Sequence, residues 1–118
     1  MQFVARHRNA PISDRKTRLV VDLIRGKHVN DALSVLRATP KRASYFVDKV
    51  LRSAMANADQ SLEADMDNLR VERAWVDGGP VRKKWHPRAR GGVGMVRNRS
   101  CHIHIVLDDG QHGRPHGA

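Results

Sequence analysis

The chain has 118 residues, the length of one domain with a single compact core. Lysine and arginine total 22 against 12 for aspartate and glutamate, so the formal net charge is +10 and the pI is near 11. This excess predicts a nucleic-acid partner, and no membrane partner, because no apolar run approaches the roughly 20 residues of a span. The start MQFVARHRN lacks a signal-peptide core and Cys101 is the only cysteine, so we expect a cytoplasmic protein without a disulfide.

The N-terminal part of the sequence predicts a strand followed by a helix. Residues 2–8 alternate as a short edge strand does. Ser13 is a suitable N-cap, and Arg25 and Gly26 are expected to end the helix as a cation and a C′ glycine. Four apolar residues at helical spacing predict the face of this helix that packs on the core: Leu19, Val20, Leu23 and Ile24.

Two more helices are expected next. A short one should begin after Asn30, and Thr39 and Pro40 should end it and serve as the N-cap and first residue of the following helix. The inward-facing residues of the short helix are predicted to be Val29, Ala32, Leu33 and Leu36. The longest helix should form the centre of the core, since its apolar residues keep helical spacing for about five turns. They are Ala43, Phe46, Val47, Val50, Leu51, Ala54 and Ala58.

From Leu69 onward the apolar period changes to two, which predicts strands. Leu69, Val71 and Trp75 mark one apolar face, so Trp75 is expected in the core. A later strand alternates Cys101, Ile103, Ile105 and Leu107 with His102, His104 and Val106. With the N-terminal strand these segments predict an α+β fold of three helices on a small three-stranded antiparallel sheet. Asp108 and Asp109 are expected to end the fold as solvated turn residues.

The stretch between these strands carries only positive charge, because residues 78–107 contain no aspartate or glutamate. Two polar arms, about 81–85 and 93–97, flank a centre rich in proline and glycine, which predicts a hairpin with a longer turn. Arms with cations on both faces have no apolar face for a core, so the hairpin should protrude. For the free protein the alternative is a disordered basic loop. We therefore expect one α+β domain over 1–110, including a hairpin at about 79–99, and a flexible tail over 111–118.

No catalytic, cofactor or metal site is expected. Cys101, His102 and His104 are metal-ligand types, but on a strand the cysteine points to the face opposite both histidines, and no second Cys/His pair has ligand spacing. The same divergence opposes a Cys-His nucleophile. Two rival functions remain open at this point. One is an architectural DNA-binding protein that inserts a basic β-arm into a groove, and the other is a small enzyme that depends on Cys101.

The candidate RNA-binding residues are the cations of the N-terminal strand, the first helix and the hairpin, together with Trp85. Trp85 has two interpretations, because it lies among cations where it either stacks on a base or is a chance exposed aromatic. The full set is Arg6, Arg8, Arg15, Lys16, Arg18, Arg25, Lys27, Arg82, Lys83, Lys84, Trp85, Arg88, Arg90, Arg97 and Arg99.

Several motifs, in order along nearly the whole chain, resemble a known family, the bacterial large-subunit ribosomal protein L-twenty-two. They are IRGK at 24–27, KVLRSA at 49–54, ANA at 56–58, GP at 79–80, PRARG at 87–91 and SCHIHIV at 100–106. The resemblance implies a structural protein of the large ribosomal subunit with no enzymatic activity. It also implies an α+β body on the subunit surface, a hairpin buried in ribosomal RNA, and binding early in subunit assembly.

The same resemblance implies where the hairpin tip lies and which partners it meets. The tip residues Arg88, Ala89, Arg90, Gly91 and Gly92 would line the polypeptide exit tunnel. The implied partners are 23S-type ribosomal RNA, neighbouring large-subunit proteins and the nascent polypeptide. No homo-oligomer is expected, because the chain leaves no obvious second apolar face.

Overall fold

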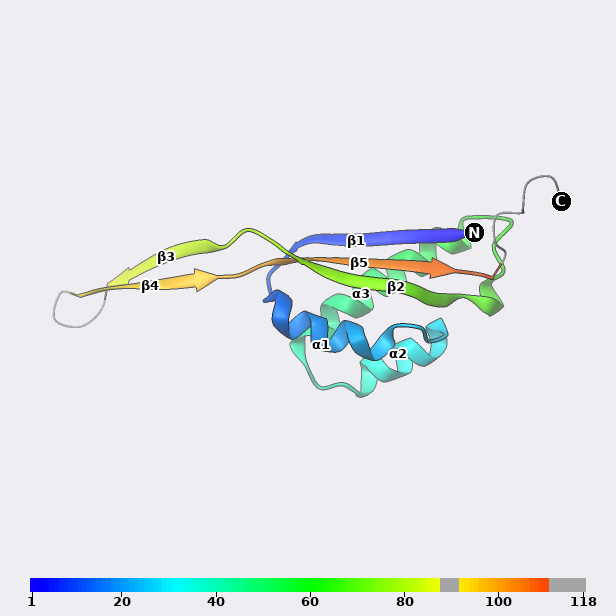
Figure 1. The fold of residues 1–118 in the computed structure, drawn as a ribbon, viewed down its shortest axis with the longest axis horizontal. Coiled ribbons are helices and arrows are strands. Elements are labelled where there is room, and N and C mark those ends of the chain that lie inside the picture. The colour runs from blue at the N-terminus through cyan, green and yellow to red at the C-terminus, as the bar shows by residue number, and fades with distance from the viewer. Residues whose placement is uncertain (88–91, 111–118) are drawn as a thin grey trace.

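The structure is a computed structural model that describes residues 1–87 and 92–110, and for residues 82, 84–87 and 93–97 the backbone alone. Its elements in chain order are β1 (Gln2–Ala10), α1 (Asp14–Ile24), α2 (Val29–Ala38), α3 (Arg42–Asp59), the short 3-10 helix η1 (Met66–Asn68), β2 (Arg70–Gly78), β3 (Arg82–Pro87), β4 (Val93–Asn98) and β5 (Cys101–Asp108). The molecule is elongated, measuring 73 × 31 × 21 Å. Figure 1 shows why: the helices lie along one half of its length, and β3 and β4 extend beyond them.

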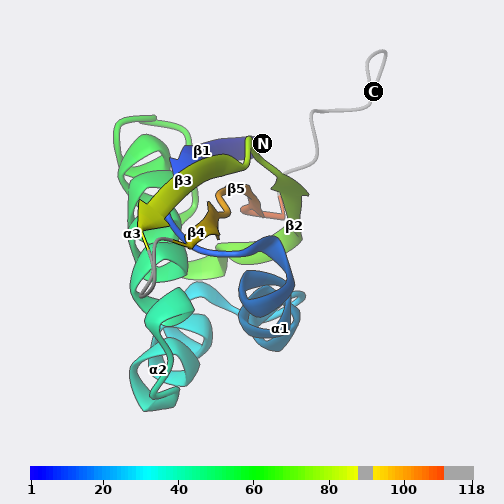
Figure 2. The ribbon, with the colours of Figure 1, turned by 90° about the vertical axis from the view of Figure 1, so that its left-hand side faces the viewer.

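The body confirms the predicted α+β fold. Its sheet has the order β1-β5-β2 with antiparallel pairing throughout, so β1 is an edge strand as expected. The three helices lie on one side of this sheet (Figure 2). The longest helix, α3, buries the whole predicted stripe, and the inward residues of β5 meet it with no exposed surface. The helices therefore cover one sheet face and leave the other without a helix.

The buried face of α1 differs from the prediction. Val20 and Ile24 are buried as expected, but Leu19 and Leu23 are exposed by 57% and 43%. The other residues that α1 buries are Thr17 and Val21. Thr17 is tolerated inside because its hydroxyl donates to the Ser13 carbonyl at 2.9 Å. Leu19 and Leu23 have the same i, i+4 spacing as Thr17 and Val21, so spacing alone did not show which pair is buried. Because Thr17 is polar, the sequence did not mark its face as the apolar one.

The caps of α2 and α3 also differ from the prediction. α2 begins at Val29, because His28 accepts the Asn30 amide N–H at 3.2 Å and acts as the N-cap. Thr39 ends α2 and does not cap α3: its hydroxyl donates backward to the Val35 carbonyl at 2.7 Å. α3 then begins after Lys41 without a side-chain cap. An 18-residue helix with a fully buried stripe tolerates this loss, which is worth about 1 kcal/mol.

Trp75 lies outside the core, which corrects the prediction from alternation. The register of β2 against β5 shifts between Val71 and Arg73, where the strand contains an extra residue. Such a bulge reverses the alternation, so the buried residues beyond it are Ala74 and Val76, and Trp75 turns to the opposite face with 37% of its surface exposed.

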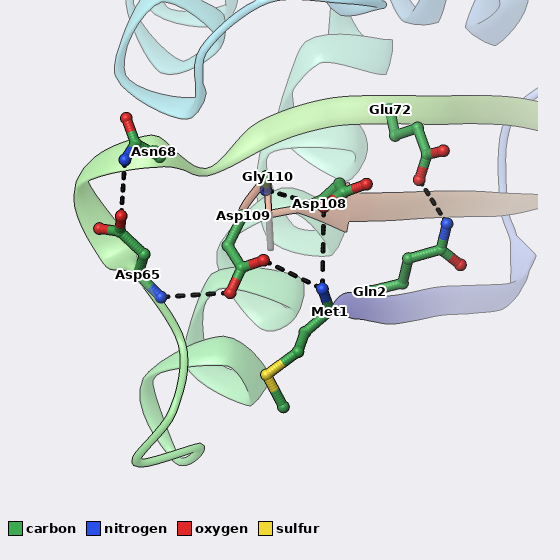
Figure 3. Close-up of polar contacts among 8 residues, drawn as sticks. All are labelled: Met1, Gln2, Asp65, Asn68, Glu72, Asp108, Asp109 and Gly110. Carbon is green, nitrogen blue, oxygen red and sulfur yellow. Dashed lines mark hydrogen bonds and ion pairs between the residues drawn. The ribbon is translucent and has the colours of Figure 1, made fainter. Parts of the chain in front are cut away.

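Asp108 and Asp109 are buried, contrary to the expectation of solvated turn residues. The Met1 α-ammonium donates to Asp109 Oδ1 at 3.0 Å, and the Asp109 side chain has no exposed surface. Its other oxygen accepts the Asp65 amide N–H at 3.2 Å. Asp108 lies beside the same ammonium at 3.9 Å and accepts the Gly110 amide N–H (Figure 3). This acidic end therefore joins three distant segments of the chain, with Asp109 as the residue common to them.

The body joins the hairpin through a close backbone contact at Gly79. The Gly79 amide N–H donates to the Ser100 carbonyl at 2.9 Å, and the Ser100 hydroxyl donates to the Pro80 carbonyl at 2.7 Å. A Cβ on Gly79 would lie 2.6 Å from Ser100 Oγ and 3.1 Å from the Ser100 carbonyl carbon and oxygen. Glycine is required here by the close approach of two backbones.

Replacing Gly79 by alanine should lower the free energy of unfolding by about 1–2 kcal/mol, because the added methyl group separates the two strands at this contact. Gly78→Ala is the matched control, since its Cβ would meet Asp14 Oδ2 at an ordinary 3.7 Å. Urea unfolding of both variants measures the difference. Equal stabilities would show that the junction relaxes without cost.

Candidate nucleic-acid interface

The hairpin presents its cations in a fixed register. β3 pairs with β4 from Arg82 opposite Asn98 to Pro87 opposite Val93. Arg82, Lys83 and Lys84 are consecutive on β3. The described backbone thus places three consecutive cationic residues on one strand of the hairpin. Neither β3 nor β4 belongs to the three-stranded sheet of the body.

The tip itself lies mostly outside the described residues. This applies to Arg88, Ala89, Arg90 and Gly91, whereas Gly92 is described and exposed. The predicted tail over 111–118 also lies outside the described residues.

A groove of about 870 Å³ lies where the hairpin meets the body. It is formed by the end of β1, the start of α1 and both strands of the hairpin base. Its cations come from three elements: Lys16 from α1, Arg42 from α3 and Arg99 from the segment before β5. Two asparagines, two serines and three apolar residues, Pro11, Ile12 and Pro80, line the rest of it, so the groove offers polar groups together with positive charge. We call it the neck groove.

Arg42 was missed by the sequence reasoning. It begins α3, more than 20 residues from either other cation of the neck groove, and no local pattern marks it. Only the packing of α3 beside β1 brings it to the groove.

The candidate cations of the body fall into two groups. Arg6, Arg8, Arg15, Lys16 and Lys27 are exposed. Arg18 and Arg25 are also exposed, but they bind the protein's own backbone: Arg18 Nη2 donates to the Val76 carbonyl at 3.0 Å, and Arg25 Nη2 to the Ala74 carbonyl at 2.8 Å. Each also pairs with an aspartate on α1. Their guanidinium groups fasten α1 to β2.

Charge is distributed unevenly along the molecule. The acidic loop that precedes β2 lies with the buried aspartates at the end of the sheet away from the hairpin (Figure 1). The acidic segment 59–68 therefore lies at the end of the body opposite the cationic hairpin. The molecule thus has a cationic end that protrudes and an acidic end that is internally bonded.

Cys101 has the properties of a structural residue. It is buried in β5, 3.6 Å from the Thr17 hydroxyl. Burial is the main cause that raises the pKa of its thiol, so the thiolate needed by a nucleophile or a metal is disfavoured at neutral pH. In the described part of the chain, no three histidine, cysteine or acidic residues are grouped to hold a metal ion. No described helix is long and apolar enough to span a membrane.

Comparison with known proteins decides the class of this basic, hairpin-bearing chain. The family model described as ribosomal protein L22p/L17e matches residues 5–108, which include the body and both hairpin strands. The chain belongs to this family. Two relatives carry the description "Large ribosomal subunit protein uL22". The one from Carboxydothermus hydrogenoformans is 53% identical over 102 residues, covering 86% of this chain and 90% of that protein. The one from Pelotomaculum thermopropionicum is 50% identical over 113 residues, covering 96% and 100%.

Family membership confirms the class of function inferred from the motifs. The chain is a structural constituent of the large ribosomal subunit and not an enzyme, with ribosomal RNA and other ribosomal proteins as partners. This decides against both the architectural DNA-binding protein and the Cys101-dependent enzyme.

Proposed function

We propose that the hairpin inserts into 23S-type RNA of the large subunit and that its tip, residues 88–92, lines the polypeptide exit tunnel beside the nascent chain. The observation that carries this proposal is a two-stranded extension of the fold whose sequence is rich in arginine and lysine and on which no helix packs. A two-stranded ribbon of this kind is marginally stable alone, and RNA supplies both the counter-charge and the packing surface. Binding of the body on the subunit surface early in assembly would precede the ordering of this arm.

The contacts we propose are mainly to phosphate. Arg82, Lys83, Lys84 and Arg97 would bind the RNA strands on the two sides of the arm, and the neck groove would hold the backbone where the arm leaves the body. The exposed cations of β1 and α1 would extend this surface along the body. Arg18 and Arg25 would contribute indirectly, by holding α1 against β2.

Replacing Arg82, Lys83 and Lys84 together by glutamine should reduce the salt dependence of binding to isolated large-subunit RNA. Each lost phosphate contact lowers the slope of log K against log salt by about 0.7–0.9, so three contacts should lower it by about 2–3. Affinity measurements over a salt series test this. The control replaces three exposed cations of α2 and α3, Arg37, Lys49 and Arg52, by glutamine. A slope equal to that of the wild-type protein would mean that these arm residues do not touch phosphate.

A further inference from the structure

The face of the body sheet that no helix covers carries an ordered aromatic and cationic cluster. In Figure 2 the helices lie to the left of and below the strands, and none lies above them. The pairing register places Arg6 opposite His104 and His104 opposite Trp75, so these three side chains form one row across β1, β5 and β2. Arg73 belongs to the next row, on the same face. We call these four residues the outer-face cluster.

The aromatic part of this cluster is held in place. The rings of Trp75 and His104 are stacked, with centroids 4.8 Å apart and an interplanar angle of 6°. His104 Nε2 lies 3.1 Å from Asp77 Oδ2, which fixes the imidazole ring. The His104 ring thus packs on one face of the Trp75 ring, yet 37% of Trp75 remains exposed. A tryptophan kept rigid but uncovered is a prepared stacking surface.

The cations of the cluster are available to a ligand. Arg6 and Arg73 are exposed, and within residues 1–87 and 92–110 neither forms an ion pair, unlike Arg18 and Arg25. The Arg73 guanidinium carbon lies over the Trp75 ring, 5.9 Å from its centroid, near the outer limit of a cation–π contact. The two guanidinium groups therefore flank the aromatic pair from β1 and from β2.

We propose that the outer-face cluster binds one unpaired ribosomal RNA nucleotide, with its base stacked on Trp75 and its neighbouring phosphates on Arg6 and Arg73. Unpaired bases of RNA stack on aromatic side chains of open antiparallel sheets, and arginine binds phosphate through paired donors. Flanking positive charge favours RNA over a protein segment as the occupant. This proposal rests on the proposed function, and it adds a second contact surface on the body, separate from the hairpin and the neck groove.

The test compares full-length variants for binding to protein-free large-subunit RNA. Trp75→Val keeps a strand-forming residue but removes the ring, and it should weaken binding about tenfold with an unchanged salt slope, because stacking releases no counterions. Trp75→Phe should retain most of the affinity. Arg6→Gln and Arg73→Gln should each lower the slope by about 0.7–0.9. The control is Tyr45→Leu on α3, another exposed aromatic with a cation, Lys49, over its ring.

Ultraviolet crosslinking gives an independent readout that does not depend on affinity. Cleavage after arginine yields a peptide from Ala74 to Arg82 that contains Trp75 and excludes Trp85. We expect this peptide to carry crosslinked RNA in assembled subunits.

Wild-type affinity in Trp75→Val, with no crosslink on the peptide, would overturn this inference while leaving the proposed function intact. If Trp75→Val binds isolated RNA normally but is depleted from subunits, the occupant is a neighbouring protein and the inference is equally wrong. Failure of the wild-type protein to prefer large-subunit RNA over another structured RNA would instead contradict the proposed function.

Discussion

Replacing Asp109 by asparagine is expected to lower the free energy of unfolding by about 2 kcal/mol. Each Asp109 oxygen accepts a different donor, the Met1 ammonium and the Asp65 amide N–H. Asparagine has one acceptor oxygen, so one of these donors would face an NH₂ group in a site without exposed surface. Breaking a fully buried ion pair costs about 3–5 kcal/mol, but Met1 is 36% exposed and can be partly rehydrated, which reduces the expected cost.

Asp67→Asn is the control for this change. It removes the same charge from an exposed side chain of the same acidic loop and should alter stability by less than about 0.5 kcal/mol. Thermal and urea unfolding of both variants measure the difference. Amide exchange should also report local loosening around Asp65 in Asp109→Asn. If the two variants unfold alike, the buried carboxylate contributes nothing beyond its charge.

The elements of the body could be predicted because their signals are local. Helical spacing in α3, alternation in β5 and the glycine at position 26 each specify their own structure, and Gly26 has the positive φ of 82° expected of a C′ residue. The protruding hairpin could also be predicted from local sequence, because a stretch with many cations and no acidic residue offers no apolar face to a core. These features need no knowledge of distant contacts.

The errors share a non-local cause. The bulge in β2 arises from its pairing with β5. The sequence of β2 alone does not show which of its alternating residues face the helices. The burial of Asp109 depends on the chain's first residue, 108 positions away. Thr17 and Arg42 gain their roles from neighbours on other elements in the same way. The sequence therefore indicated the cationic arm but neither the neck groove nor the outer-face cluster.

Shortening the hairpin tip should separate assembly from tunnel function. The register places Pro87 opposite Val93, so replacing residues 88–92 by Asn-Gly would join β3 and β4 by a two-residue turn without changing their pairing. Only Arg88 and Arg90 are lost among 22 basic residues, so most of the electrostatic affinity should remain. We expect near-normal incorporation of this variant into large subunits.

The same variant should change the response of the ribosome to macrolide-type inhibitors and to stalling nascent peptides, because the proposed tunnel wall loses three residues of length and two charges. Subunits that contain only the variant allow occupancy and inhibition to be measured on one preparation. A double variant, Arg88→Gln with Arg90→Gln, keeps the loop length and isolates the effect of charge from that of shape. Loss of incorporation would identify the tip as an assembly anchor. Inhibition equal to that of wild-type ribosomes would show that the tip does not line the tunnel.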